Sequence, residues 1–162
     1  MMKFKTILAI SVAALCWAAC SDKEDLPAVA DIAGSYKGYT LAGCAYFQNM
    51  CTEDEIVVIG ENADGSANMT FTSASWGEFT IPNAQMSMNG GTYTLTGSGL
   101  TKMGMNGNVS SYDCTCTAVI ESREKAQIQF KVPGVMGGLT IDFTTGKAPA
   151  DLLPDKAPAA AE

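Results

Sequence analysis

Residues 127–144 read QIQFKVPGVMGGLTIDFT, and most of the fold class follows from them. Apolar Ile128 and Phe130 alternate with polar side chains, and the same alternation resumes after residues 133–138. A period of two is typical of a strand with one face in a core and the other in water. The intervening segment contains a proline and glycines, which favours a loop between two antiparallel strands. We therefore predict a β-hairpin here.

The same alternation recurs along the chain, in segments separated by short polar and glycine-rich turns. It is clear around Phe71 and around Leu95, each flanked by threonines. Residues 56–59 form a continuous apolar run, which indicates burial on both faces or a strong twist. The turns lie at residues 62–66, 89–91, 104–108 and 122–125. No segment has a sustained helical period, so we predict an all-β domain of eight or nine short antiparallel strands over residues 32–146, a sandwich or a barrel.

The first 19 residues have the features of a secretory signal peptide. Lys3 and Lys5 precede an apolar run at residues 7–15, and small Ala18 and Ala19 follow it. The run is too short to span a membrane, which takes about 20 apolar residues. The sequence therefore predicts that residues 1–19 are a signal peptide that is removed on export.

Residues 17–20, WAAC, resemble the lipobox of bacterial lipoproteins, in which the cysteine is acylated and becomes the first mature residue. The resemblance implies lipidation of Cys20. Residues 20–31 then form an acidic tether, and the alanine- and proline-rich residues 147–162 are expected to be a disordered tail. The acids after Cys20 also resemble a signal that exports some lipoproteins to the cell surface, although a plain polar spacer explains them equally well. We expect an outer membrane lipoprotein, held to the membrane by its lipid anchor, on the cell surface or the periplasmic face.

The mature chain is strongly acidic and lacks histidine. The whole chain has ten basic and 17 acidic residues; losing the two lysines of the signal leaves eight basic ones and a net charge of −9. Such a surface repels phosphate groups, so nucleic acid is not expected as a partner. The absence of histidine removes the commonest general base and metal ligand. The acids show no pairing of the kind that glycosidases use. We predict no enzyme activity, no cofactor and no metal.

Four cysteines remain once the signal peptide and Cys20 are set aside: Cys44, Cys51, Cys114 and Cys116. An even number of cysteines in an exported domain favours disulfides. Cys44 and Cys51 bracket a loop at a spacing suited to a local bridge, or each of them bonds one of the later two. A bond between Cys114 and Cys116 would distort their strand, because they lie two residues apart on one face.

Sulfur pairs suggest Cu(I) binding as an alternative role, because thiolates and thioethers are soft ligands. Each pair places two sulfur atoms on one face of an extended segment. The pairs are Met86 and Met88, Met103 and Met105, and Cys114 and Cys116. Methionine also fills irregular interiors through its flexibility alone, and we favour that interpretation.

The predicted domain opens with Gly34-Ser35-Tyr36-Lys37-Gly38-Tyr39, a glycine-x-aromatic motif followed by consecutive hairpins. Together with DGSANMT at residues 64–70 and GEFTIPN at residues 77–83, this opening resembles the calycins, the superfamily that contains the lipocalins. It is more similar still to the calycin-like lipoproteins of unknown function in gut-type Gram-negative bacteria. The resemblance covers residues 34–146 and implies an up-and-down β-barrel of about eight strands. The last strand of such a barrel closes on the first and leaves room for one small ligand.

The resemblance also implies a function, the binding of a small apolar or amphipathic ligand in the barrel of a membrane-anchored protein. Nine inward-facing residues are expected to line the core or the ligand site: Met69, Phe71, Phe79, Ile81, Met86, Met88, Ile128, Phe130 and Phe143. The alternative is a structural lipoprotein with a solid barrel. Its loops, near residues 44–51 and 101–112, would then contact another envelope protein.

Overall fold

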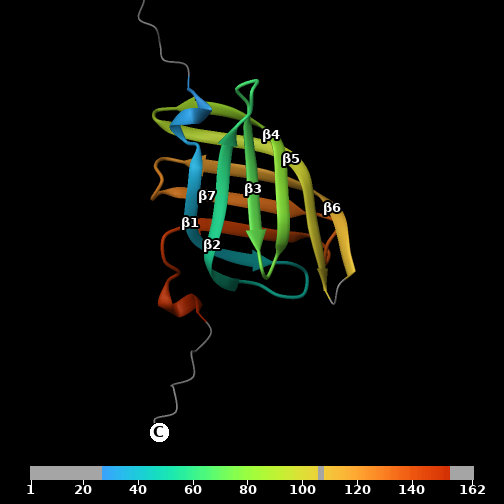
Figure 1. Cartoon of the computed structure of the whole chain (residues 1–162). Coiled ribbons are helices and arrows are strands. Elements are labelled where there is room, and N and C mark those ends of the chain that lie inside the picture. Colours follow the sequence, from blue (N-terminus) through green and yellow to red (C-terminus); the bar gives the residue numbers. More distant parts are fainter. Residues whose placement is uncertain (1–26, 106–107, 154–162) are drawn as a thin grey trace, which may run out of the picture.

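A computed structural model of the protein describes residues 27–105 and 108–153. Within them, eight strands form one closed barrel (Figure 1). The strands are β1 (Gly34–Gly43), β2 (Met50–Glu61), β3 (Ala67–Ser73), β4 (Gly77–Asn89), β5 (Thr92–Met105), β6 (Asn108–Ile120), β7 (Ala126–Val132) and β8 (Leu139–Thr145). Two short 3-10 helices flank them in the sequence, η1 (Val29–Asp31) and η2 (Ala150–Leu152).

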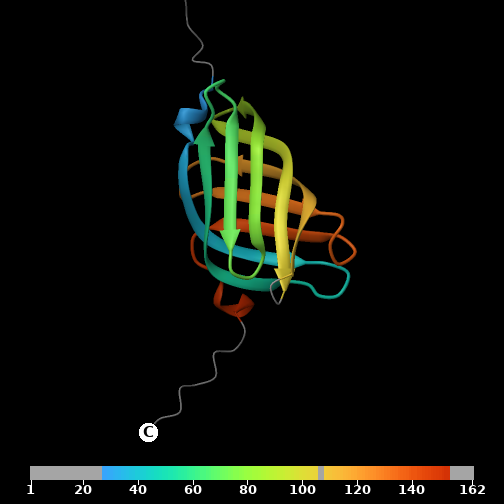
Figure 2. The ribbon, with the colours of Figure 1, turned by 45° about the vertical axis from the view of Figure 1, so that its right-hand side comes forward.

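The strands follow one another around the barrel in chain order. Each strand pairs antiparallel with the next, and β8 pairs with β1 to close the barrel. In Figures 1 and 2, β2, β3 and β4 on one wall cross β7 on the opposite wall at a steep angle, as tilted barrel strands do. The predicted all-β, up-and-down barrel of about eight strands is thereby confirmed.

The hairpin of β7 and β8 has the alternation that its sequence predicts. Ile128 lies opposite Phe143, Phe130 lies opposite Ile141, and all four side chains are buried. The apolar run at residues 56–59 behaves differently from the prediction of burial on both faces. Only its alternate residues point inward, and the other two lie on the outer face with about two fifths of their surface exposed. The strand alternates like its neighbours but carries apolar side chains on both faces.

Phenylalanine side chains fill the centre of the barrel. Phe71 on β3, Phe79 on β4 and Phe130 on β7 lie with their ring centroids 5.1 to 5.4 Å apart. All three side chains are fully buried. An eight-stranded barrel is just wide enough for side chains to fill its interior, and these rings do so by contact across it.

Two glycines let β5 bend closely against β4. A Cβ atom at Gly97 would lie 2.6 Å from Cγ2 of Ile81, and one at Gly99 would overlap the carbonyl oxygen of Thr80. The pairing register of β4 with β5 also shifts between Thr80 and Gln85. Glycine is required at this bend because the neighbouring strand occupies the space of a side chain.

One end of the barrel is covered by η1, and we call it the closed end. Val29 and Ile32 are buried there. The Tyr36 hydroxyl donates a hydrogen bond of 2.6 Å to the Ile32 carbonyl oxygen, and the Arg123 guanidinium donates one to the carbonyl oxygen of Ala33. These contacts fix η1 across the barrel end.

The described residues extend beyond the predicted domain, residues 32–146, at both ends. η1 lies within the predicted tether, and Val29 joins the core because its side chain is apolar and buried. η2 lies within the predicted tail. The signal peptide, Cys20 and residues 154–162 lie outside the described residues, so the predictions made for them stay predictions. Among the residues described, no helix has the length and apolarity that a membrane crossing requires.

Candidate functional site

The end of the barrel opposite η1 is formed by loops, and we call residues 44–49, 74–76 and 133–138 the mouth (Figure 1). The Cys44 amide donates to the Phe47 carbonyl oxygen at 2.8 Å, and the Ala45 amide donates to that of Met136 at 3.3 Å. The second bond joins the first mouth loop to the last. Phe47 stacks on Trp76 of the middle loop, with the ring centroids 6.1 Å apart. The three loops therefore form one connected surface.

A hollow of about 640 Å³ lies at the mouth. Its apolar lining comes from all three mouth loops, the start of β2 and the segment after η2. It is lined by Phe47, Met50, Cys51, Thr52, Glu53, Ser75, Trp76, Met136 and Leu153. Met50 and Met136 leave about half of their surface in contact with solvent. This is an apolar, accessible surface on a rigid scaffold, the kind of place where small ligands bind.

Four polar side chains are buried in the described part of the barrel, and all of them belong to strand segments near the mouth. We call them the polar cluster: Thr40, Glu55, Ser73 and Thr101. The Ser73 hydroxyl donates to the Glu55 carboxyl at 2.7 Å and accepts a bond from the Trp76 amide at 3.2 Å. The Trp76 indole N–H donates to the Thr40 hydroxyl at 3.2 Å. The Thr101 hydroxyl is fully buried and has no hydrogen-bond partner among the described residues.

Glu55 is the acidic member of the polar cluster and is only 5% exposed. Burial raises the pKa of its carboxyl above the ordinary value, and the hydrogen bond from Ser73 opposes that rise. The ion pairs of the described residues, Lys102 with Glu78 and Lys125 with Glu121, do not involve it. Glu55 is thus a buried acid whose neutral form is favoured by burial.

In the sequence, Glu53, Asp54 and Glu55 stand together before an apolar run and suggest a solvated acidic loop, and for Glu55 this expectation is wrong. The structure extends β2 through these residues and bulges it, with Asp54 at a φ of 57° and a register shift opposite Gly38 and Thr40. After the bulge, the Glu55 side chain faces the interior, as the side chains of Val57 and Ile59 do further along β2. The sequence contains this signal: Glu55 stands two positions before Val57, and residues two apart on a strand face the same side.

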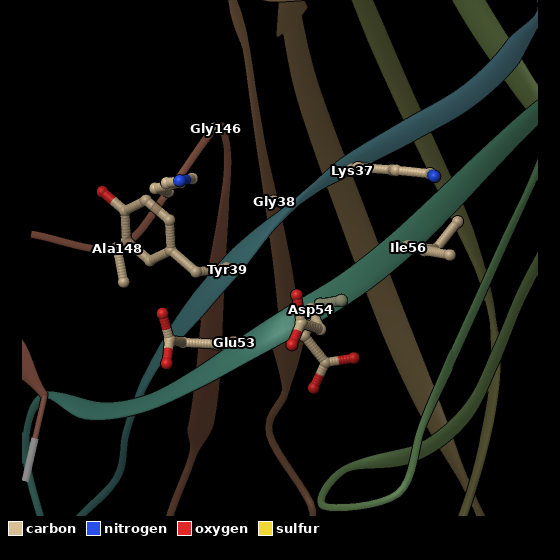
Figure 3. Close-up of a pocket in the computed structure, with 10 residues that line it drawn as sticks. Lys37, Gly38, Tyr39, Glu53, Asp54, Ile56, Gly146 and Ala148 are labelled. Carbon is tan, nitrogen blue, oxygen red and sulfur yellow. The ribbon is translucent and has the colours of Figure 1, made fainter. Parts of the chain in front are cut away.

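A second hollow, of about 390 Å³, lies outside the bulge (Figure 3). Figure 3 shows Lys37 at one side of it and Glu53 beside Tyr39 at the other. The charged side chains of Lys37, Glu53, Asp54 and Lys147 in its lining are exposed to solvent, and Glu55 is the buried one. This hollow offers mixed, solvated charge rather than a defined binding surface, so we place the candidate site at the mouth.

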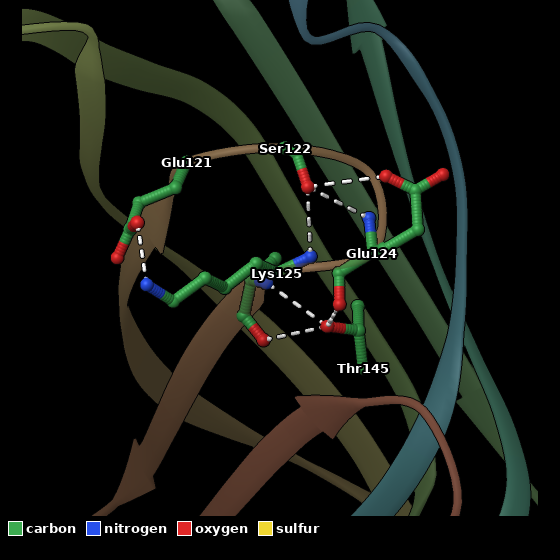
Figure 4. Close-up of polar contacts among 6 residues, drawn as sticks. Glu121, Ser122, Glu124, Lys125 and Thr145 are labelled. Atoms are coloured by element: carbon green, nitrogen blue, oxygen red, sulfur yellow. Dashed lines mark hydrogen bonds and ion pairs between the residues drawn. The ribbon is translucent and has the colours of Figure 1, made fainter.

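Polar groups at the closed end satisfy one another, in contrast to those near the mouth. In the β6–β7 turn, the Ser122 hydroxyl donates to the Glu124 carboxylate at 3.1 Å and accepts the Lys125 amide at 3.1 Å (Figure 4). The Thr145 hydroxyl at the end of β8 donates to the Glu124 carbonyl oxygen at 2.8 Å. The Lys125 ammonium lies 2.6 Å from the Glu121 carboxylate. The charged and polar side chains of the predicted turn at residues 122–125 thus serve to hold the turn together.

Seven of the nine predicted ligand-lining residues lie in the packed core rather than around the mouth hollow: Met69, Phe71, Phe79, Ile81, Ile128, Phe130 and Phe143. Met86 is partly buried against that core. Met88 was predicted to face inward and is instead 42% exposed. It pairs with Tyr93 next to the β4–β5 turn, where β4 runs past the covered end of the barrel. Sequence reasoning missed Met50 and Met136, because loop residues carry no periodic signal.

The four cysteines are free thiols in the structure, so the predicted disulfides are not confirmed. Cys114 and Cys116 point into the barrel from β6, opposite Gly99 and Gly97 of β5. Burial raises the pKa of Cys114 to about 11 and that of Cys116 to about 12. The Cys116 thiol donates to the Met69 sulfur at 3.3 Å. Both therefore behave as small core residues.

The other two cysteines lie at the mouth. Cys44 is buried beneath its loop, and its sulfur accepts a hydrogen bond from the Tyr46 amide at 3.4 Å. Cys51 is half-buried at the edge of the hollow, with its pKa raised first by burial and then by the charge of Glu53. Within residues 27–105 and 108–153, no group of three or more histidine, cysteine, aspartate or glutamate side chains is arranged to hold a metal ion.

Comparison with known proteins returns a structural relative. A crystal structure of a presumed outer membrane protein from Bacteroides fragilis superimposes with a TM-score of 0.61 and 35% sequence identity. The match covers 73% of this chain and 45% of that one, so this chain spans less than half of the relative's length. The two proteins share the barrel fold. No protein-family model matches the chain, and no curated protein does.

Proposed function

We propose that this protein is a calycin-like envelope lipoprotein whose barrel binds a small apolar or amphipathic ligand at its mouth. The observation that carries the proposal is the hollow of about 640 Å³ with Phe47, Trp76 and Met136 in its lining. The centre of the barrel is filled by the three phenylalanine rings, so the proposed ligand rests on the mouth and not in the middle of the barrel.

The proposed location rests on the N-terminal sequence and on the structural relative. The signal peptide and the acylated Cys20 would deliver the barrel to the outer membrane and hold it there. The relative from Bacteroides fragilis, with which 73% of this chain aligns, is described as a presumed outer membrane protein. We propose binding rather than catalysis because the chain has no histidine and its buried acid stands without a second carboxylate beside it in the polar cluster.

Two methionines of nearly equal exposure provide a matched test. Met136 lines the hollow and is 43% exposed, whereas Met88 is 42% exposed near the closed end. Met136 also has a φ of 50°, a conformation that asparagine tolerates well. We expect Met136→Asn to weaken binding of the neutral fluorophore N-phenyl-1-naphthylamine about tenfold, or about 1.4 kcal/mol, because an apolar contact is lost. Met88→Asn should leave the affinity unchanged.

The probe is titrated into the chain from residue 21 onward, which keeps every described residue, and its emission is followed. Equal affinities for the two variants would place the probe elsewhere on the protein. Absence of any saturable binding to the parent protein would refute the proposed function.

Contact with a partner protein through the mouth is a second candidate, and the packed barrel centre favours it. Tyr46, in the first mouth loop, is 81% exposed and is the most exposed aromatic side chain of the described residues. Exposed aromatic side chains are typical anchors of protein interfaces. A photo-crosslinking amino acid at Tyr46, with one at Met88 as control, should then yield one discrete product in intact cells. Identical products from both positions would contradict this candidate.

A further inference from the structure

Four polar side chains are buried near the mouth, and the Thr101 hydroxyl is the one among the described residues that has no hydrogen-bond partner. It lies opposite Phe79 on β4 and Tyr112 on β6, so its immediate neighbours in the wall are aromatic. A buried polar atom without a partner is unfavourable, and such atoms are rare in structures unless a function or a bound group accounts for them.

The Glu55 carboxyl has a single hydrogen-bond partner within the described part of the chain and is 5% exposed. One oxygen accepts the Ser73 hydroxyl, and the described residues supply no other hydrogen bond to this side chain. Lys37, a basic residue that lines the outer hollow with Glu55, lies on the outward face of β1 and forms no ion pair with it. A buried acid of this kind is strongly stabilised by a cation that also donates hydrogen bonds.

Trp76 links the polar cluster to the hollow. Its amide and its indole N–H bond Ser73 and Thr40 of the cluster, while its ring lines the hollow and stacks on Phe47. The loop that carries Trp76 has only three residues, 74–76, and ends at Gly77, whose φ of 84° favours glycine. A ligand in the hollow therefore contacts the residue that joins the hollow to Ser73, the hydrogen-bond partner of Glu55.

We propose that the ligand is an amphipath with a protonated amine head. Its apolar tail lies in the mouth hollow, and its ammonium group displaces the Trp76 indole and pairs with Glu55. This inference rests on the proposed function and names the chemistry of its ligand. An ammonium group has three donors, enough for the Glu55 carboxylate and for the hydroxyl oxygens of the polar cluster. Its charge is also attracted by the aromatic face of Trp76.

The charge of the protein supports an amine over an acid. The mature chain has a net charge of −9, and the exposed carboxylate of Glu53 lines the hollow. A negative surface raises the local concentration of cations and repels fatty acids and other anionic amphipaths. Burial raises the pKa of Glu55, and an ammonium group beside it acts in the opposite sense: it stabilises the carboxylate, and the carboxyl proton leaves to solvent.

Decylamine, decanol and decanoate have tails of equal length and test the head group alone. The chain has two tryptophans, Trp17 and Trp76, so Trp76 is the single tryptophan from residue 21 onward and its emission reports the displaced indole. We expect decylamine to bind at least about tenfold more tightly than decanol and to shift Trp76 emission to longer wavelength, because charge-assisted hydrogen bonds are the stronger ones. Decanoate should bind most weakly.

Glu55→Gln is the decisive variant and Glu53→Gln its control, because both remove one acid at the mouth. The side-chain amide oxygen introduced by Glu55→Gln would still accept the Ser73 bond, so the expected result is decylamine affinity reduced to that of decanol, with decanol unchanged. Glu53→Gln should reduce decylamine affinity by no more than about twofold, an effect that salt removes. Thr40→Val provides a second variant if Glu55→Gln does not fold, and it should also weaken decylamine selectively, because the Thr40 hydroxyl is the acceptor that the displaced indole leaves free.

The outcomes separate this inference from the function on which it rests. Equal binding of the three ligands to the parent protein would overturn the amine head and leave the proposed function standing. Equal losses of decylamine affinity from Glu55→Gln and Glu53→Gln would overturn the pairing with Glu55 too, because they would show that the amine is attracted only by the negative charge of the surface. Failure of all three ligands and of the neutral fluorophore to bind would overturn both.

Discussion

Thr40 and Thr101 are both fully buried in the polar cluster, but only one of them has a hydrogen bond. Thr40 accepts the indole N–H of Trp76, whereas the Thr101 hydroxyl has no partner among the described residues. Thr101→Val should therefore raise the free energy of unfolding by about 1 kcal/mol, because it replaces an unsatisfied hydroxyl with a methyl group of similar size. Thr40→Val should lower it by about 1–3 kcal/mol, because the indole N–H loses its acceptor. Urea unfolding in the absence of ligand measures both, and effects of the same sign would contradict the assignment.

Glu55 makes the stability of the barrel depend on pH in a defined direction. Burial raises its pKa in the folded state, so the folded protein holds this proton more tightly than the unfolded chain does. The stabilisation is complete below the ordinary pKa of glutamate and is lost as the pH rises through the raised folded-state pKa. Glu55→Gln should therefore be more stable than the parent at about pH 8, and the difference should vanish at about pH 4, below the pKa of an ordinary glutamate. Urea unfolding at both pH values checks this, with the exposed Glu53→Gln as control; a difference of opposite sign would refute it.

At the scale of elements, the sequence was sufficient wherever a strand obeys simple alternation. The β7–β8 hairpin follows directly from residues 127–144, because each inward residue meets an inward residue across the pair. It was insufficient at the β2 bulge, where an extra residue changes which side chains face inward and brings Glu55 into the interior. The sequence could not predict the mouth hollow either, because residues such as Met136 and Leu153 are brought together there only by the arrangement of the loops.

The close approach of β5 to β4 can be tested by measuring how much a Cβ atom at Gly99 destabilises the barrel. A Cβ at Gly99 would overlap the backbone of β4, and backbone cannot move aside without breaking the strand pairing. At Gly60 the contact would be 2.7 Å from the Asn68 side-chain oxygen, which can rotate away. Gly99→Ala should thus destabilise the barrel by about 1–3 kcal/mol, the usual cost of overpacking, and Gly60→Ala by clearly less. Thermal unfolding of the two variants tests this, and equal costs would show that β5 does not need the close approach.

At the scale of the whole molecule, the two ends of the barrel differ: η1 covers the closed end, and loops form the mouth. The chain enters the barrel through η1 at the closed end, and the mouth loops lie at the other end (Figure 1). Val29 follows Cys20 by nine residues, which span at most about 30 Å when extended. An acyl chain on Cys20 would thus hold the closed end nearer the membrane and leave the mouth free to meet the proposed ligand.

This arrangement predicts that anchoring and ligand binding are separable. Cys20→Ala should abolish the globomycin-sensitive shift in gel mobility that acylated lipoproteins show, and it should release the protein from the membrane fraction, because the acidic chain has no basic patch to replace the lipid. The N-phenyl-1-naphthylamine affinity of the released protein should match that of the chain from residue 21 onward, because the mouth lies at the far end from the anchor. Met136→Asn should do the reverse and keep the mobility shift while it weakens the probe. Retention of the Cys20→Ala variant in the membrane fraction, with its mobility still sensitive to globomycin, would refute acylation at this residue.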